Sequence, residues 1–309
     1  MVSFSGDLAR FRTPAMRRLI VNGDDFGYTR GVNAGILEAF RGGILTSTTL
    51  MAIGDAFEDA VRLARETPGL GVGCHLVLVG ERAVAPAETI PTLAGPDGRL
   101  PGSLGELVGR LALGRVRQAD IETELRAQIG RITKAGIRPT HVDTHKHTHL
   151  YPRVMAAVAR VASEFGIGAV RKPYESLRTL FGGGRGNGSD RGEMGRSITA
   201  AAAGAGRGRF RRLTRADGMR TPDHFCGIRW TGSLSAEDVL RLLERLPEGT
   251  TELMCHPGYR DAELDGKATR LKGERQRELE ALTAPEVKTA VRECGIRLIS
   301  YRELAESDV

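Results

Sequence analysis

Histidines and aspartates recur at every second position in one short stretch of the chain. From residue 141 to residue 149 every second residue is His or Asp, and the stretch holds four of the seven histidines. If it is extended, these five side chains point to one face, because side chains alternate along a strand. Imidazoles and a carboxylate that converge can hold a divalent metal ion or move protons. Two alternatives stay open: a helical turn with His145 and His149 on one side, and an exposed polar strand.

Two adjacent aspartates, Asp24 and Asp25, come shortly after the apolar run 19–21. Neighbouring side chains of a regular strand face opposite ways, so both carboxylates can serve one site only where the strand breaks into a turn. Gly23 and Gly27 on either side permit that break. One carboxylate could then bind a metal ion while the other takes a proton. The alternative is a solvated turn or a helix cap, where aspartate is common.

Two further histidines are associated with apolar runs. His75 lies within the run 71–78, where a buried imidazole needs a metal ion or a hydrogen-bonding group as its partner. His256 follows an apolar run and precedes a Pro-Gly pair, which leaves it at a strand tip as a candidate general acid or an ordinary turn residue. Cys74 and Cys255 each precede one of these histidines. Strand alternation turns both thiols away, so we interpret them as core residues and not as ligands.

The segments that carry these residues alternate between short apolar strands and amphipathic helices. Strands are predicted at residues 19–21, 48–53, 71–79, 140–144, 168–171, 251–255 and 295–299. Helices are predicted at residues 31–40, 57–64 (with Asp55 as N-cap), 121–135, 152–165, 236–246 and 273–294 (split near Pro285). Such alternation implies parallel pairing with right-handed crossovers.

The predicted fold is α/β, a (β/α) barrel of a distorted TIM-like kind with seven or eight strands. The runner-up is an open doubly wound sheet, which the lack of a glycine-rich phosphate loop makes less attractive for nucleotide binding. Active sites of such barrels lie at the carboxyl ends of the strands. We therefore expect four separate segments, which carry Asp24 and Asp25, His75, residues 141–149 and His256, to meet at one rim.

The strand and helix pattern fails between residues 182 and 208, where ten of 27 residues are glycine. We expect one domain over residues 18–303, with a Gly/Arg-rich insertion or lid at about residues 182–215. The net charge of +7 comes from this region, because residues 171–220 contain twelve basic and four acidic residues. The stretch from Arg207 to Arg215 could contact a nucleic acid or an anionic membrane surface, although a solvated lid face is the simpler interpretation.

The composition excludes several classes of protein. With 40% hydrophobic residues the 309-residue chain can build a core, which excludes a wholly disordered protein. Aromatic residues make up 5%, which argues against base-stacking surfaces, so no nucleic-acid partner is expected. No apolar run approaches the roughly 18 residues of a membrane span. The four cysteines contain no CxxC pair, and the first 17 residues do not resemble a secretory signal, so a cytoplasmic location is expected.

Five segments occur together in the order and spacing of one known family: residues 19–27, 42–48, 71–76, 141–149 and 252–258. In this combination the chain resembles the YdjC-like carbohydrate deacetylases, which include chitooligosaccharide and hopanoid-biosynthesis deacetylases. The resemblance covers about residues 18–303. Two positions depart from the pattern: Gly23 stands where the family usually has Ala, and Cys74 where it often has Leu. Neither change removes a polar group.

The resemblance implies a barrel fold and a deacetylase that uses one divalent metal ion, Mg²⁺ or Zn²⁺. By that resemblance Asp25, His75 and His145 hold the ion, Asp24 is the general base and His256 is a candidate acid. The implied substrate is an N-acetylated amino sugar, chitooligosaccharide-like or lipid-linked, which is converted to acetate and a free amine.

The sequence also suggests candidate substrate contacts and two alternative functions. Lys172, Tyr174 and Asp223 are candidates for the substrate groove, and a homodimer is left open. An amidohydrolase- or phosphoesterase-like metal hydrolase is one alternative function. Those enzymes usually carry an HxH pair on the first strand, where this chain has Asp-Asp. A non-catalytic protein that binds an anionic surface through its arginine-rich stretch is the other alternative.

Overall fold

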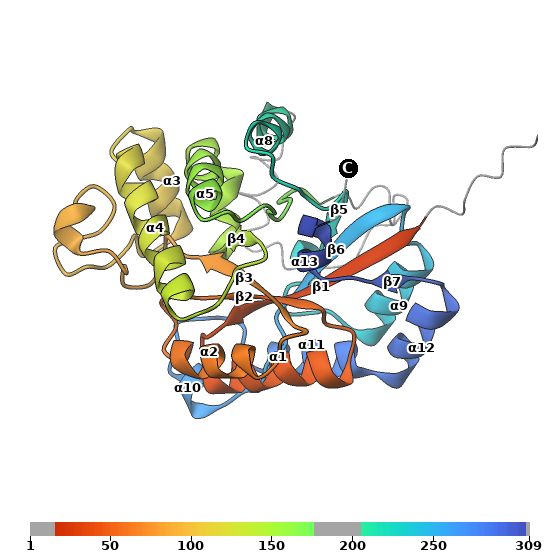
Figure 1. Ribbon diagram of the computed structural model, residues 1–309. Helices are drawn as coiled ribbons and strands as arrows, with labels where there is room; N and C mark the ends of the chain where they lie inside the picture. Colours follow the sequence, from red (N-terminus) through yellow and green to blue (C-terminus); the bar gives the residue numbers. More distant parts are fainter. Residues whose placement is uncertain (1–15, 176–204, 307–309) are drawn as a thin grey trace, which may run out of the picture.

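The computed structural model describes residues 16–175 and 205–306, and these residues form a parallel sheet surrounded by helices. The sheet has seven strands in the order β4-β3-β2-β1-β6-β5, and β7 pairs with β1 (Figure 1). The strands are β1 (Arg17–Phe26), β2 (Ser47–Leu50), β3 (Gly71–Leu76), β4 (Val142–Thr144), β5 (His224–Cys226), β6 (Gly249–Cys255) and β7 (Arg297–Leu298). Every strand pair is parallel, as predicted.

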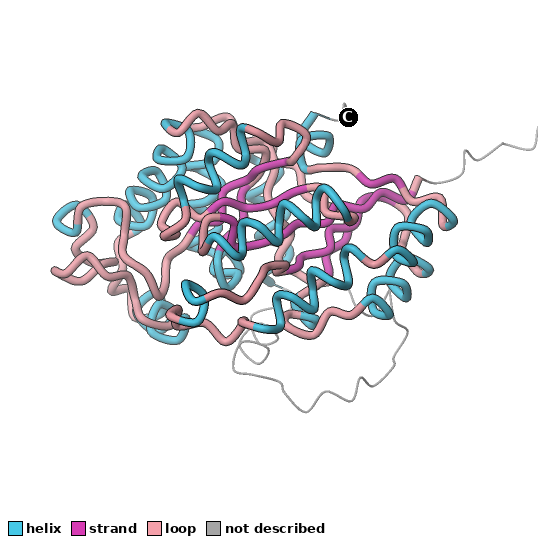
Figure 2. Tube along the Cα trace, turned by 90° about the horizontal axis from the view of Figure 1, so that it is seen from below, coloured by secondary structure: helices cyan, strands magenta, loops and turns pink. Residues whose placement is uncertain are grey.

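Helices lie around the strands, which gather in the middle of the molecule (Figure 2). They are α1 (Arg30–Gly42), α2 (Phe57–Arg65), α3 (Leu104–Ala112), α4 (Gln118–Lys134), α5 (Pro152–Glu164), α8 (Ala205–Ala216), α9 (Ala236–Glu244), α10 (Ala262–Asp265), α11 (Gly273–Thr283), α12 (Pro285–Glu293) and α13 (Tyr301–Glu306). Short 3₁₀ turns are η1 (Ala87–Thr89), η2 (His145–Leu150) and η3 (Ile228–Trp230). The predicted split near Pro285 is confirmed, since this proline begins α12.

The sheet is curled but does not form a fully paired ring in the described part of the chain. Its two ends are β4 and β5. Beyond β4, isolated bridges join Val142 to Val170 and Ala169 to Arg220, which stands four residues before β5 begins. The expected strand at 168–171 is present only as these bridges. The predicted α/β fold with a parallel sheet is therefore confirmed. Of the predicted TIM-like barrel, the described residues form a half-barrel.

Strand β1 shows how the sequence divides the inside of this curl from its outside. Leu19 and Val21 belong to the large apolar cluster that includes the helices. Ile20 belongs to a small separate cluster with Ala169, Ile299, Tyr301 and Leu304. Because side chains alternate along a strand, Asn22 and Asp24 continue the face of Ile20. The interior is therefore apolar near the amino ends of the strands and polar toward their carboxyl ends.

Three local predictions differ from the structure. Asp55 does not cap α2, whose N-cap is Ala56 without a side-chain bond; Asp55 pairs instead with Lys267 at 2.6 Å. Helix α8 lies largely within the predicted insertion at about residues 182–215, and Phe210 and Thr214 give this arginine-rich helix a buried side. Residues 182–204 of the predicted insertion lie outside the described residues.

The third difference concerns residues 141–149, which are extended only over β4. His145 begins η2, in which Lys146 and His147 have left-handed backbone angles (φ 53° and 52°). The prediction of five side chains on one face of a long strand is therefore wrong.

Within the described ranges, no helix is long and apolar enough to cross a membrane.

Candidate metal centre and catalytic site

A bulge in β1 brings the two adjacent aspartates to the same side of the sheet. Gly23 pairs with Thr48 and Phe26 with Leu50, so β1 holds one more residue than β2 between these pairs. Asp25 takes the extra turn with φ 69°, in the left-handed region that aspartate tolerates better than most residues. Both carboxylates are buried. The expected break in the strand is therefore present, and it lets Asp24 and Asp25 serve one site.

Three side chains from separate segments place one potential metal-ligand atom each around a common point. Asp25 Oδ1 lies 3.3 Å from His75 Nε2 and 3.4 Å from His145 Nδ1. The two imidazole nitrogens are 3.3 Å apart. Two ligands about 2.0–2.1 Å from a tetrahedral ion would be separated by about 3.3–3.4 Å. The three atoms therefore have the spacing and chemistry that fit one small divalent cation.

The hydrogen bonding and the ionisation of the Asp25 carboxylate also fit the binding of a cation. Its Oδ1 is buried and has no hydrogen-bond partner among the residues that the structure describes. Its Oδ2 is held by Arg275 Nη2 at 2.6 Å. Although burial opposes ionisation, Arg275 and the two imidazoles hold the pKa of Asp25 well below its usual range. Oδ1 is therefore an ionised oxygen that faces the His75 and His145 ring nitrogens without a regular hydrogen bond, and a metal ion between the three atoms would satisfy it.

Asp143, on β4, orients the His75 ring. Its Oδ1 lies 2.7 Å from His75 Nδ1, so that nitrogen donates and Nε2 is turned toward Asp25 and His145. Burial would lower the pKa of His75, but Asp143 and Asp25 raise it to about 10. The ring is therefore protonated in the metal-free protein, and a bound ion would take the place of the Nε2 proton.

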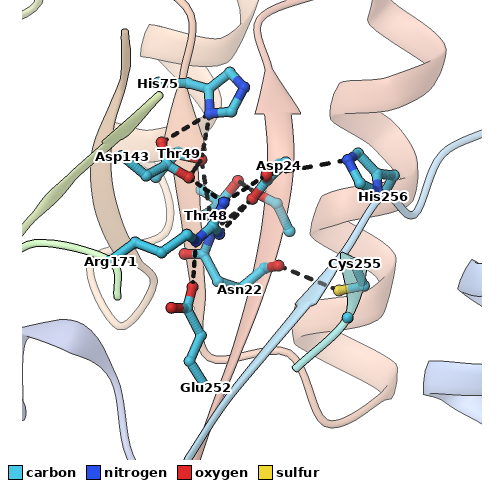
Figure 3. A network of polar contacts seen from close by, with 12 residues as sticks. Asn22, Asp24, Thr48, Thr49, His75, Asp143, Arg171, Glu252, Cys255 and His256 are labelled. Atoms are coloured by element: carbon cyan, nitrogen blue, oxygen red, sulfur yellow. Dashed lines mark hydrogen bonds and ion pairs between the residues drawn. The ribbon is translucent and has the colours of Figure 1, made fainter. Parts of the chain in front are cut away.

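Arg171 is the centre of a second buried cluster, in which it contacts Asp24 and Glu252 (Figure 3). Its Nη1 and Nη2 hold Asp24 Oδ2 and Oδ1 at 2.7 and 2.6 Å. The same guanidinium is 2.5 Å from Asp143 and 2.8 Å from Glu252. Burial raises the pKa of Asp24, but Arg171 outweighs it and holds this pKa well below its usual range. Asp24 is therefore an ionised carboxylate with both oxygens directed to Arg171.

Replacing Arg171 with methionine is expected to destabilise the protein strongly. Three buried carboxylates would lose their common partner, and breaking a buried ion pair typically costs about 3–5 kcal/mol. Urea denaturation would measure the free energy of unfolding. Arg160→Met is the matched control, because the Arg160 side chain is 69% exposed and its ion pairs are long. A loss below about 1 kcal/mol for Arg171→Met would contradict this role.

His256 follows β6 and stands beside Asp24. Its Nε2 is 4.0 Å from Asp24 Oδ2, and its Nδ1 is 3.9 Å from Glu278 Oε2. Glu278 also accepts the backbone N–H of His256 at 2.6 Å, which fixes the loop. Burial lowers the pKa of His256 to about 4, even though Asp24 and Asp25 act in the opposite direction. The ring is therefore uncharged at neutral pH.

The other histidines of residues 141–149 face elsewhere. His141 Nε2 is 3.1 Å from Asn22 Oδ1, and its ring stacks on Tyr301 with centroids 3.6 Å apart. His149 Nδ1 is 2.6 Å from Thr144 Oγ1. The His147 ring lies beside Phe225, with centroids 5.9 Å apart. Of this stretch, only Asp143 and His145 contact the residues of the proposed centre.

Four charged residues of the site were missed by sequence reasoning: Arg171, Glu252, Arg275 and Glu278. Arg171 had a signal, because it ends the predicted strand 168–171, where a barrel places its polar residues. Arg275 and Glu278 lie one turn apart on α11 and have no motif around them. The buried thiols of Cys74 and Cys255 confirm that these two residues belong to the core.

The three residues expected in the substrate groove lie outside this cluster of contacts. Asp223 Oδ2 accepts the backbone N–H of Thr250 at 2.8 Å, at the amino end of β6, opposite to His256. Lys172 Nζ donates to the Asp223 carbonyl. Tyr174 is buried against Phe210 of α8, with ring centroids 5.6 Å apart. A substrate contact at these residues stays a prediction.

Helix α8 packs against α5 (Figure 1), and several of its arginines are exposed to solvent. The exposed arginines are Arg207, Arg209, Arg211, Arg212 and Arg215. The helix is anchored through its apolar side, where Phe210 is buried. The arginine-rich stretch is therefore an ordered, strongly basic surface, and its partner stays open.

Comparisons with known proteins show which family and which curated proteins this chain is similar to. A family model described as YdjC-like protein matches residues 18–293. A protein named carbohydrate deacetylase from Geobacillus stearothermophilus is 36% identical over 93% of this chain and 98% of its own. One of the same name from Brevibacillus brevis is 35% identical over 93% of this chain and 99% of its own.

A crystal structure from Enterococcus faecalis V583, described as a candidate cellobiose-phosphate cleavage protein, has the same fold. Its TM-score is 0.72 at 28% identity, and the match covers 94% of this chain and 99% of that one. The family match and the two curated relatives each span most of this chain. The chain belongs to the YdjC-like protein family.

Proposed function

We propose that this protein is a metal-dependent carbohydrate deacetylase. It hydrolyses the acetamide of an N-acetylated amino sugar and releases acetate and a free amine. The observation that carries the proposal is the spacing of Asp25 Oδ1, His75 Nε2 and His145 Nδ1, 3.3–3.4 Å apart, beside the ionised carboxylate of Asp24. The names of the relatives from G. stearothermophilus and B. brevis support the same reaction.

Asp25, His75 and His145 would hold the divalent ion. One carboxylate and two imidazoles suit Zn²⁺, and Mg²⁺ is the alternative that the family resemblance brings. When bound, such an ion lowers the pKa of water and polarises a carbonyl oxygen. His145 is the most accessible of the three, with 28% of its side chain exposed, so substrate would reach the centre from its side.

Asp24 is the proposed general base. Arg171 binds both of its oxygens, which orients the carboxylate and keeps it ionised. The same ion pair lowers the basicity of Asp24, so this carboxylate would act on a water molecule whose own pKa a bound ion would lower. Asp24 takes one proton from that water as its oxygen attacks the acetyl carbon.

His256 is the proposed acid, on the condition that it first receives a proton. Its pKa of about 4 leaves the ring uncharged at neutral pH, so it has no proton to give without forming an imidazolate. Asp24 Oδ2 lies 4.0 Å from His256 Nε2, beyond hydrogen-bond distance, so passing on the proton taken from water requires the two groups to move closer or a bridging water. His256 then gives this proton to the amine nitrogen as the carbon–nitrogen bond breaks, so the protons balance.

The substrate is proposed as a chitooligosaccharide-like or lipid-linked N-acetylglucosamine. Lys172, Tyr174 and Asp223 remain proposed substrate contacts. The basic surface of α8 would serve a lipid-linked substrate by attracting anionic lipids. Acetate release from N-acetylglucosamine monomers, chitooligomers and an N-acetylated glycolipid distinguishes these substrates.

Acetate release after removal and return of the metal tests the function directly. We expect the stripped protein to be inactive on every substrate and the reloaded protein to release acetate from at least one. A parallel assay with generic phosphate esters tests the phosphoesterase alternative. Phosphate release without any acetate release from the reloaded protein would contradict the proposed deacetylase.

A further inference from the structure

Arg275 is a fully buried cation that lies against one of the proposed metal ligands. It stands in the first turn of α11, and its side chain is 1% exposed. Its Nη2 is 2.6 Å from Asp25 Oδ2, and its Nε donates to the carbonyl of Leu271 at 3.3 Å. The Tyr28 ring lies 5.9 Å from the guanidinium carbon. Arg275 thus reaches from an outer helix to the bulge of β1, 250 residues earlier in the chain.

The environment of Arg275 offers little else to compensate its charge. Asp25 is its one ion-pair partner among the described residues, and Nη1 is buried without a hydrogen-bond partner there. Glu278, one turn further along α11, directs its oxygens to the backbone N–H groups of Gly232 and His256, each at 2.6 Å. Burying a guanidinium with incomplete partners is unfavourable, which points to a role beyond packing.

The two buried arginines bind the two adjacent aspartates in different ways. Arg171 binds both oxygens of Asp24. Arg275 binds only Oδ2 of Asp25 and leaves Oδ1 directed at His75 and His145. When one oxygen of a carboxylate is held by an ion pair, rotation of the group is restricted, and the direction of the other oxygen is therefore fixed.

We propose that Arg275 is a positioning residue that holds Asp25 Oδ2 and so presents Oδ1 alone to a divalent cation. It acts through Asp25 and does not contact the substrate. The inference rests on the proposed function for the identity of the site as a metal centre, and it adds the residue that sets how Asp25 binds the ion.

Positioning and simple charge repulsion predict opposite results when Arg275 is removed. A cation beside a ligand repels a metal ion, so if repulsion dominated, its removal would tighten metal binding. If Arg275 orients Asp25, its removal frees the carboxylate to rotate and weakens metal binding. Loss of the groups that orient a ligand typically lowers metal affinity about 10–100-fold.

The experiment compares zinc binding by the stripped full-length protein and its variants, using calorimetry at one neutral pH. We expect Arg275→Met to raise the Kd for Zn²⁺ by about 10–100-fold, and Arg275→Lys, whose ammonium can still bond to Oδ2, to recover part of the affinity. Two controls should bind zinc as the unmodified protein does. Arg277→Met removes an arginine of α11 that is 65% exposed, and Leu279→Ala destabilises the same helix without touching Asp25.

The outcomes separate this inference from the function on which it rests. If the unmodified protein binds neither Zn²⁺ nor Mg²⁺, the proposed function fails. If it binds zinc and folded Arg275→Met binds as tightly or more tightly, the positioning role is overturned while the function stands. If Arg275→Met does not fold, a crystal structure of the zinc-loaded unmodified protein decides. Asp25 bound through Oδ1 with Oδ2 still on Arg275 supports the role, whereas both oxygens on the ion and a broken Arg275 contact overturn it.

Discussion

Replacing His75 with alanine is expected to abolish metal binding and to lower kcat/KM by about 10³-fold or more. His75 supplies one of three ligand atoms spaced 3.3–3.4 Å apart, and the Asp143 contact fixes its ring, so no neighbouring group can take its place. A metal ion contributes several kcal/mol to transition-state stabilisation, which corresponds to this loss of rate. His145→Ala should behave in the same way.

Bound metal and acetate release would be measured on the same preparation, with circular dichroism as a check of folding. His224→Ala is the control, because His224 begins β5 and makes none of the contacts of the proposed centre. Full metal occupancy in a folded His75→Ala or His145→Ala variant would remove that residue from the set of ligands.

Replacing Asp24 with asparagine is expected to leave the metal in place and to lower kcat by about 10²–10⁴-fold. The amide cannot accept a proton from water, while the three proposed ligand atoms belong to Asp25, His75 and His145, the first of two candidate groups; the second is Asp24, His75 and Asp143. Because the effect falls on the chemical step, KM should change little. Steady-state kinetics and metal analysis together test this prediction.

Asp217→Asn is the matched control for that experiment, since Asp217 is exposed just beyond α8. An Asp24→Asn enzyme with nearly full kcat would rule out Asp24 as the base. A variant that loses both metal and rate would show that Asp24 supports the metal centre instead, which contradicts the separate roles assigned to the two aspartates.

Local patterns in the sequence predict much of the fold and part of the site. The apolar runs 19–21, 71–79 and 251–255 correspond to β1, β3 and β6, since such runs with turn residues beside them favour buried parallel strands. The glycines around Asp24 and Asp25 indicate a break in the strand, and the bulge occurs there. In both cases the determining residues are close together in the chain.

The features that the sequence does not predict depend on residues far apart. Arg171 meets Asp24 across 147 positions, and Arg275 meets Asp25 across 250, so no local pattern marks either pair. The turn at Lys146 and His147 adopts left-handed angles, which are uncommon for residues other than glycine. Alternation alone therefore predicts a longer strand, and the surrounding tertiary structure imposes the turn.

The most direct measurement is an anomalous-scattering map from a crystal of the zinc-loaded protein. We predict a single strong peak about 2.0–2.2 Å from Asp25 Oδ1, His75 Nε2 and His145 Nδ1. The electron density of the same crystal should show Asp24 on Arg171 and not on the ion. No peak between the three ligand atoms, or a peak bound by other residues, would contradict the metal centre on which the proposed reaction depends.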